Sequence, residues 1–126
     1  MNTSTTLKDA AIDFLRLTAA GQVDEAFARY AAPTFRHHNP WFASDAATIQ
    51  AGMRANAAAH PQMEFEVLRA LAVGAQVAVH SRACMAPGTP NIAVVHILRF
   101  EDGKIAEMWD IGQPEPSPMA NELGMF

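Results

Sequence analysis

Two residues near the end of the chain have side chains that can move a proton. Asp110 follows Trp109 near the end of an apolar segment typical of a β-strand, and His96 lies in the apolar segment before it. A carboxylate that faces an apolar interior must be paired, be neutral or take part in chemistry. An imidazole beside it could orient it or donate a hydrogen bond to an oxyanion. The pair indicates acid–base catalysis; the alternative is a strand-end aspartate that only accepts hydrogen bonds from backbone amides.

The turn between these two strands decides whether the two side chains share a face of the sheet. A two-residue turn at residues 102–103 would put His96 and Asp110 on opposite faces. A three-residue loop with a bulge at Gly103 would pair Asp110 with Val94 and make the two residues diagonal neighbours on one face. We favour the bulged register because it keeps the apolar residues of both strands together, and we predict one shared cavity.

Other histidines and large apolar residues could line this cavity. Adjacent residues of an extended segment point opposite ways, so only one of His37 and His38 can enter it. We assign His38, together with His80, to ligand binding and interpret His37 as a solvated turn residue. The alternative for His38 is likewise a solvated turn residue, and for His80 a satisfied or half-exposed histidine of the sheet. Aromatic and methionine residues are more often plain core, but six could form the apolar wall: Trp41, Phe42, Met53, Met63, Met85 and Met108.

Motifs for metals and for common cofactors are missing from the sequence. Histidines and an aspartate could in principle bind zinc, but no two of them show the i, i+2 or i, i+4 spacing common in such sites. Cys84 is the only cysteine, so the chain cannot form an internal disulfide. There is no phosphate-binding loop, dinucleotide motif or Gly-x-Ser-x-Gly elbow. We therefore predict no metal site.

Composition places the chain among globular proteins. It has 126 residues, of which 50% are hydrophobic and 17% charged, enough for one domain over residues 1–126 with a real core. The net charge of −4, without a basic stripe, argues against nucleic acid or an anionic membrane surface as a partner. The first residues lack the basic and apolar pattern of a secretion signal, and no segment is long enough to span a membrane, so we expect a cytoplasmic protein.

The first half of the sequence has helical periodicity. Thr6 and Asp9 resemble a capping box that opens a helix ending near Gly21. A second, shorter helix is predicted from Val23 to the region of Pro33. Ser44 is expected to cap a third helix that stops before Pro61.

The second half has the alternation of β-strands. Four strands are predicted over residues 63–73, 76–86, 91–101 and 104–112, close enough together to pair antiparallel. Helices followed by such strands predict an α+β domain with the helices packed on one face of a curved sheet. The tail over residues 113–126 contains three prolines and should lie extended across a surface.

Three segments together resemble a known family. "HHNP" in the first half, "VAVHSR" in a middle strand and "ILRFEDGKIAEMWDIGQPEP" at the end are similar to the SnoaL-like polyketide cyclases of the NTF2-like superfamily. The resemblance runs from about residue 7 to the chain end. It implies a cone-shaped α+β barrel in which three helices pack on a strongly curved antiparallel or mixed sheet, with the ligand held inside the cone.

The resemblance also implies roles for the two proton-moving residues. In the characterised cyclases, an aspartate matching Asp110 is the acid–base residue of an intramolecular aldol closure, assisted by a histidine matching His96. No metal or organic cofactor is used. Many relatives carry His where this chain has Met108 and an acid where it has His96. The absence of His at position 108 removes one possible partner of Asp110. The superfamily also includes isomerases, dehydratases, epoxide hydrolases and proteins that only bind ligands.

These observations lead to one leading hypothesis and one alternative. We expect a cofactor-free enzyme of cyclase, aldol or isomerase type acting on a small hydrophobic carbonyl compound. The alternative is a ligand-binding or assembly module without catalysis. We also expect a homodimer through the outer face of the sheet, because an apolar set there would otherwise face water: Val95, Ile97, Ile105 and Trp109.

Overall fold

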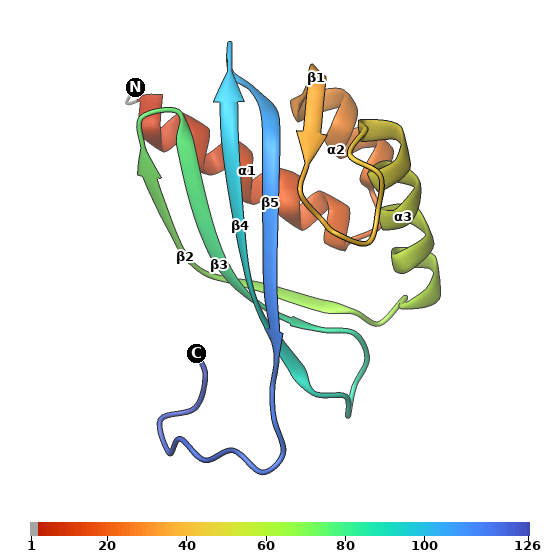
Figure 1. Cartoon of the computed structure of the whole chain (residues 1–126), viewed down its shortest axis with the longest axis vertical. Helices are drawn as coiled ribbons and strands as arrows, with labels where there is room; N and C mark the ends of the chain where they lie inside the picture. The colour runs from red at the N-terminus through yellow and green to blue at the C-terminus, as the bar shows by residue number, and fades with distance from the viewer. Residues whose placement is uncertain (1–2) are drawn as a thin grey trace.

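A five-stranded sheet with helices on one face forms the molecule (Figure 1). The computed structural model describes residues 3–126, with side chains from Leu7 onward. The elements in order are α1 (Thr3–Ala19), α2 (Val23–Tyr30), β1 (Ala31–His37), α3 (Ala46–Ala59), β2 (Glu64–Val73), β3 (Gln76–Cys84), β4 (Asn91–Glu101) and β5 (Lys104–Pro114). The strand order is β1-β5-β4-β3-β2, with β1 parallel to β5 and the other neighbours antiparallel. The predicted α+β class is confirmed, and the sheet is curved and mixed but not closed into a barrel.

The core lies between the helices and the concave face of the sheet. Phe14 of α1 is fully buried, and its ring meets that of Phe27 of α2 edge to face at 5.3 Å between centroids. Phe35 of β1 packs on Phe27 at 5.1 Å in the same manner. These three rings join α1, α2 and β1 by burial of large apolar surfaces.

Two helix starts differ from the prediction. α1 begins at Thr3, before the predicted cap at Thr6, whose side chain lies outside the described residues. α3 is capped by Asp45 rather than Ser44: the Asp45 carboxylate accepts a hydrogen bond of 2.9 Å from the backbone N–H of Thr48. Asp45 has the extended backbone of a cap residue and satisfies an N–H that the helix leaves unpaired.

Strand β1 was not predicted from the sequence. The second helix was expected to reach the region of Pro33 and His37 to lie in a turn, but α2 stops at Tyr30 and the chain continues as an edge strand. Pro33 is tolerated because an edge strand has a free side that needs no N–H donor. Since β1 runs parallel to β5 and pairs His37 with Met108, the loop after β1 lies beside the part of β5 that contains Asp110.

The pairing of β4 with β5 combines the two turns considered above. Asp102 and Gly103 both have positive φ, 51° and 77°, as in a two-residue turn that matches the twist of a hairpin. A bulge then follows inside β5, where Ala106 is the extra residue. His96 therefore lies directly opposite Asp110, not diagonal to it. The predicted pairing of Asp110 was wrong, but the prediction of a shared face is confirmed.

The same bulge changes the outer face of the sheet. Ile105 was expected there, but it is fully buried in the core, as is its neighbour Ala106. Two adjacent residues of one strand can both face inward only where the alternation is interrupted, as it is at a bulge.

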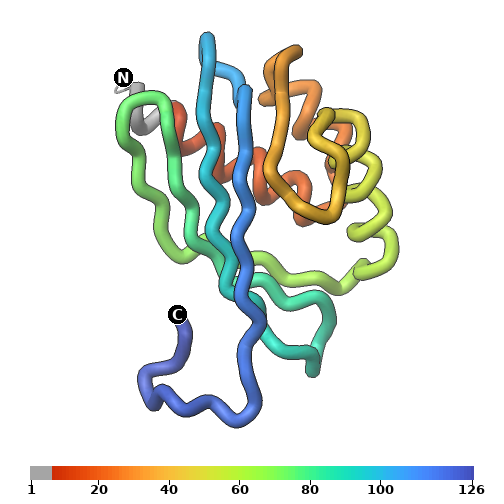
Figure 2. Tube along the Cα trace, in the orientation of Figure 1, coloured from red at the N-terminus to blue at the C-terminus, as the bar shows by residue number. Residues whose placement is uncertain are grey.

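The tail beyond β5 runs without helix or strand and turns back toward the sheet (Figure 2). β5 itself extends to Pro114, two residues further than predicted, and pairs there with Ile92. The last residue, Phe126, stacks its ring on His80 with 6.4 Å between centroids. Beyond Pro114 the tail contains neither helix nor strand, and it bends back on itself instead of following one straight path. Among the described helices, none combines the length and apolar character needed to cross a bilayer.

Candidate active site

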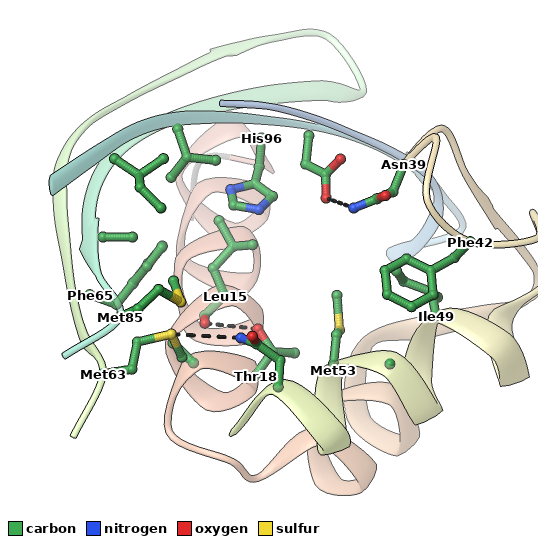
Figure 3. A pocket seen from close by; sticks show the side chains of 17 residues that line it. Leu15, Thr18, Asn39, Phe42, Ile49, Met53, Met63, Phe65, Met85 and His96 are labelled. Atoms are coloured by element: carbon green, nitrogen blue, oxygen red, sulfur yellow. Dashed lines mark hydrogen bonds between the residues drawn. The ribbon is translucent and has the colours of Figure 1, made fainter. Parts of the chain in front are cut away.

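A cavity of about 330 Å³ lies between the concave face of the sheet and the helices (Figure 3). Its wall is mainly apolar, which strengthens electrostatic interactions inside it. The lining residues are Leu15, Thr18, Ala19, Asn39, Phe42, Ile49, Gly52, Met53, Asn56, Met63, Phe65, Ala83, Met85, Ile92, Val94, His96 and Asp110. His96 and Asp110 therefore share this cavity as predicted.

The carboxylate of Asp110 is held by one amide. Asn39 donates from Nδ2 to Oδ2 of Asp110 over 2.9 Å (Figure 3). The Asn39 Oδ1 accepts the backbone N–H of Trp41 at 2.9 Å, which fixes the orientation of the amide and points its NH₂ toward the carboxylate. Among the described residues, Oδ1 of Asp110 receives no hydrogen bond, so this oxygen is available to a ligand.

The loop that carries Asn39 is held in turn by His37. This imidazole is buried: Nε2 lies 2.6 Å from the carbonyl oxygen of Ala43, and Nδ1 accepts the backbone N–H of Asn39 at 3.0 Å. Nδ1 must be unprotonated to accept, so Nε2 carries the proton and donates to Ala43. The interpretation of His37 as a solvated turn residue was wrong; it braces the loop next to the site.

His96 of β4 is paired directly with Asp110 of β5. Directly paired positions of antiparallel strands place Cβ atoms about 5 Å apart. Burial lowers the pKa of His96 from 6.5 to about 4, although the charge of Asp110 acts in the opposite direction. The ring is neutral near pH 7, and its buried Nδ1 has no protein partner among the described residues. A neutral imidazole with unused hydrogen-bonding capacity can donate to, or accept from, a bound ligand.

The lowered pKa of His96 predicts a pH dependence of stability. The folded protein binds this proton only near pH 4, whereas the unfolded chain binds it near 6.5, so stability is lost as pH falls between these values. Between these pH values the wild-type protein should lose on the order of 1–3 kcal/mol of unfolding free energy because of His96. The His96→Gln variant should not show this loss. Urea unfolding of both proteins at pH 4 to 7 measures it. Parallel curves for the two proteins would contradict the prediction.

The predicted apolar lining is partly correct. Phe42 and Met53 lie in the cavity wall, as do Met63 and Met85. Trp41 is 86% exposed and does not line the cavity; only its backbone N–H reaches Asn39. Met108 is fully buried in the core cluster instead, since the bulge places it opposite Leu98 rather than opposite His96.

Both other predicted ligand-binding histidines lie on the outer face of the sheet. His38 stacks on Trp109 with 4.8 Å between centroids, and its Nε2 lies 2.6 Å from Glu107. The hydrogen bond from His38 is the main reason that the pKa of Glu107 is lowered. His80 contacts Arg69 and the ring of Phe126. Their assignment to the cavity was wrong, because each alternates with a buried neighbour that faces inward.

Asn39 is the residue of the site that sequence reasoning missed. It had been noted only as a turn residue before Pro40, although it stands inside the "HHNP" segment of the family resemblance. Among the described residues, no three His, Cys, Asp or Glu side chains come together where they could share a metal ion. Of the polar residues that line the cavity, Asp110, His96 and Asn39 lie together, whereas Thr18 and Asn56 bond to Leu15 and Met63.

A curved mixed sheet that packs on helices around an apolar cavity, with a carboxylate and an imidazole on its wall, defines a class of small cone-shaped α+β proteins. Residues 11–108 match the family model of the SnoaL-like domain. The chain therefore belongs to the SnoaL-like family, within the NTF2-like superfamily. No curated protein matches the sequence.

Solved structures with this fold carry several different names. The chain is 19% identical to AclR of Streptomyces galilaeus, a candidate hydroxylase, over 88% of this chain and 91% of that one, with a TM-score of 0.73. A candidate ketosteroid isomerase from Kribbella flavida is 21% identical over 98% and 96%, at 0.73. IdmH of Streptomyces antibioticus, a candidate polyketide cyclase, is 21% identical over 85% and 91%, at 0.69. At these identities the likeness shows the fold alone.

Proposed function

We propose that this protein is a cofactor-independent acid–base enzyme of cyclase, aldol or isomerase type. The observation that carries the proposal is the placement of Asp110 directly opposite His96 on the wall of an apolar cavity. The names of the cyclase and isomerase neighbours are compatible with such chemistry. The substrate class is a small hydrophobic carbonyl compound with an acidic α-hydrogen, because the wall is apolar and its few polar groups can serve proton transfer.

Asp110 is the proton acceptor in this proposal. Asn39 holds one carboxylate oxygen, which leaves the other to take the α-hydrogen of the substrate. Proton transfer by a positioned carboxylate requires a fixed geometry, and a single amide hydrogen bond supplies it without adding a positive charge that would weaken the base.

His96 stabilises the enolate that this proton transfer produces. Because burial keeps its ring neutral, it acts as a hydrogen-bond donor to the enolate oxygen rather than as a cation paired with Asp110. A neutral donor leaves the negative charge of the Asp110 carboxylate intact until it accepts the proton. The two residues would then act on the α-carbon and on the carbonyl oxygen of one substrate.

The function can be tested by hydrogen exchange on a surrogate ketone. We would incubate the protein with 2-tetralone, a bicyclic ketone with acidic α-hydrogens, in D₂O and follow loss of the α-proton signal by NMR. Exchange above the buffer rate supports the enzyme. Binding of the ketone without faster exchange would favour the alternative of a ligand-binding module.

We further propose that the protein forms a homodimer through the outer face of the sheet. Large apolar side chains there remain exposed, namely Leu71 at 67%, Val73 at 80% and Ile111 at 61%. Light scattering at micromolar concentration should give about twice the chain mass of 13.6 kDa, and Ile111→Glu should reduce it to the monomer because a charge would be buried at the contact. A wild-type monomer would contradict the proposal.

A further inference from the structure

Phe42 stands at the opening of the cavity. Its ring belongs to the cavity wall and is also 39% exposed. Among the lining residues, only Phe42 and Asn56 are exposed. Figure 3 shows the Phe42 ring at one end of the cavity. A side chain that contacts both the interior and the solvent is placed to control entry and exit.

The ring of Phe42 rests on α3 at Gly52. A Cβ atom at position 52 would lie 2.4 Å from Cε1 and 2.7 Å from Cζ of the Phe42 ring, far inside van der Waals contact. Gly52 lies in the helix interior, where glycine is less favourable than alanine. The close approach of the ring is therefore the structural reason for a glycine at this position.

The position of the ring is linked to the catalytic carboxylate through one short loop. The backbone N–H of Phe42 donates to the carbonyl oxygen of Asn39 at 3.3 Å, and the Asn39 side chain donates to Asp110. His37 holds this loop through its hydrogen bonds with the backbone of Ala43 and Asn39. The loop conformation that seats the ring on Gly52 is thus the one that orients Asp110.

We propose that Phe42 and Gly52 form a gate and its seat, which retain the ligand in the cavity and limit its size. This inference rests on the proposed function only in taking the cavity as the ligand site. With the ring seated on Gly52, the cavity of about 330 Å³ still opens to solvent, and the ring narrows this opening, so an apolar compound of matching size leaves slowly and a bulkier one enters slowly. When the ring leaves Gly52, this opening widens.

The contact between gate and seat can be tested without any ligand. Gly52→Ala should lower the melting temperature of the wild-type protein, because the new methyl group displaces the ring. In a Phe42→Ala background the same change should raise the melting temperature, because alanine favours the helix and nothing remains to collide. Only a direct contact between the Phe42 ring and position 52 predicts that the change in melting temperature reverses its sign between the two backgrounds. A rise of equal size in both backgrounds would overturn the proposal.

Gating itself can be tested with a fluorescent probe. We would use 1-aminoanthracene, a neutral tricyclic amine that brightens in apolar surroundings, and measure its dissociation rate by stopped flow. Phe42→Ala and Gly52→Ala should each raise that rate by about tenfold, and the double variant should match Phe42→Ala alone. Trp41→Ala, which removes an exposed neighbouring ring, is the matched control and should leave the rate unchanged.

The results of these experiments distinguish the proposed role of Phe42 and Gly52 from the proposed enzymatic function. An unchanged dissociation rate in Gly52→Ala, or additive effects of the two substitutions, would overturn the gate even if ketone exchange is observed. Conversely, absence of ketone exchange together with non-additive rates and the reversal of the melting shift would support the gate and count against the enzyme alone.

Discussion

Replacing Asp110 with Asn should slow α-hydrogen exchange of 2-tetralone by about 10² to 10⁴-fold, the usual contribution of a positioned general base. Asparagine has nearly the same shape as aspartate but cannot accept the proton. Because the substitution removes the base and leaves the apolar wall in place, the affinity for the ketone should change only a few fold. NMR exchange rates and a fluorescence-displacement titration measure the two quantities separately.

Asp102→Asn is the matched control for this prediction. It removes the same charge from an exposed turn, where the positive φ of 51° is well tolerated by asparagine, so exchange should stay at the wild-type rate. An Asp110→Asn protein that retains the wild-type exchange rate would exclude Asp110 as the base. An equal loss in both variants would point to net charge rather than to the site.

Replacing Phe14 with Ala should lower the free energy of unfolding by about 3–5 kcal/mol, the range for a buried aromatic residue in a core. Phe14 is fully buried, and its ring meets Phe27 at 5.3 Å and Phe35 at 6.4 Å between centroids. The substitution would leave a cavity between α1, α2 and β1 that helices and sheet can close only in part. Urea unfolding followed by circular dichroism measures the change.

Trp41→Ala provides the comparison for stability as well. Its side chain is larger than that of Phe14 but 86% exposed, so its removal should change the free energy of unfolding by no more than about 0.5 kcal/mol. Similar losses in both variants would mean that the three-ring cluster is not the centre of the core.

Phe14→Ala should also affect the site at a distance. The ring packs on Phe35, which lies in β1 two residues before His37, and the loop that orients Asp110 begins directly after that strand. A loosened β1 should therefore reduce ketone exchange at urea concentrations that leave the sheet folded.

Local sequence patterns were sufficient for most of the elements and for one feature of the site. The alternation of apolar residues located β2 to β5 within two residues at each end, and the helical periodicity located α1 and α3. Alternation has a period of two, so the choice of register determines which side chains face the cavity, and the apolar pattern alone favoured a register that unites His96 and Asp110. The exact pairing differed because the bulge lies at Ala106 inside the strand, where two consecutive apolar residues carry no signal that one of them is extra.

The remaining parts of the site depend on contacts between distant segments. Asn39 reaches Asp110 across 71 residues of sequence, and it does so because β1 pairs in parallel with β5, which no local pattern around Pro33 reveals. His38 and His80 were placed in the cavity from residue type alone, whereas the face that each occupies follows from the pairing of β1 and β3 with their neighbours. The sequence by itself determined the helices, four of the strands and the candidate acid–base pair. Only the tertiary structure decided which amide holds Asp110, because side chains far apart in sequence meet according to strand order and sheet curvature rather than local periodicity.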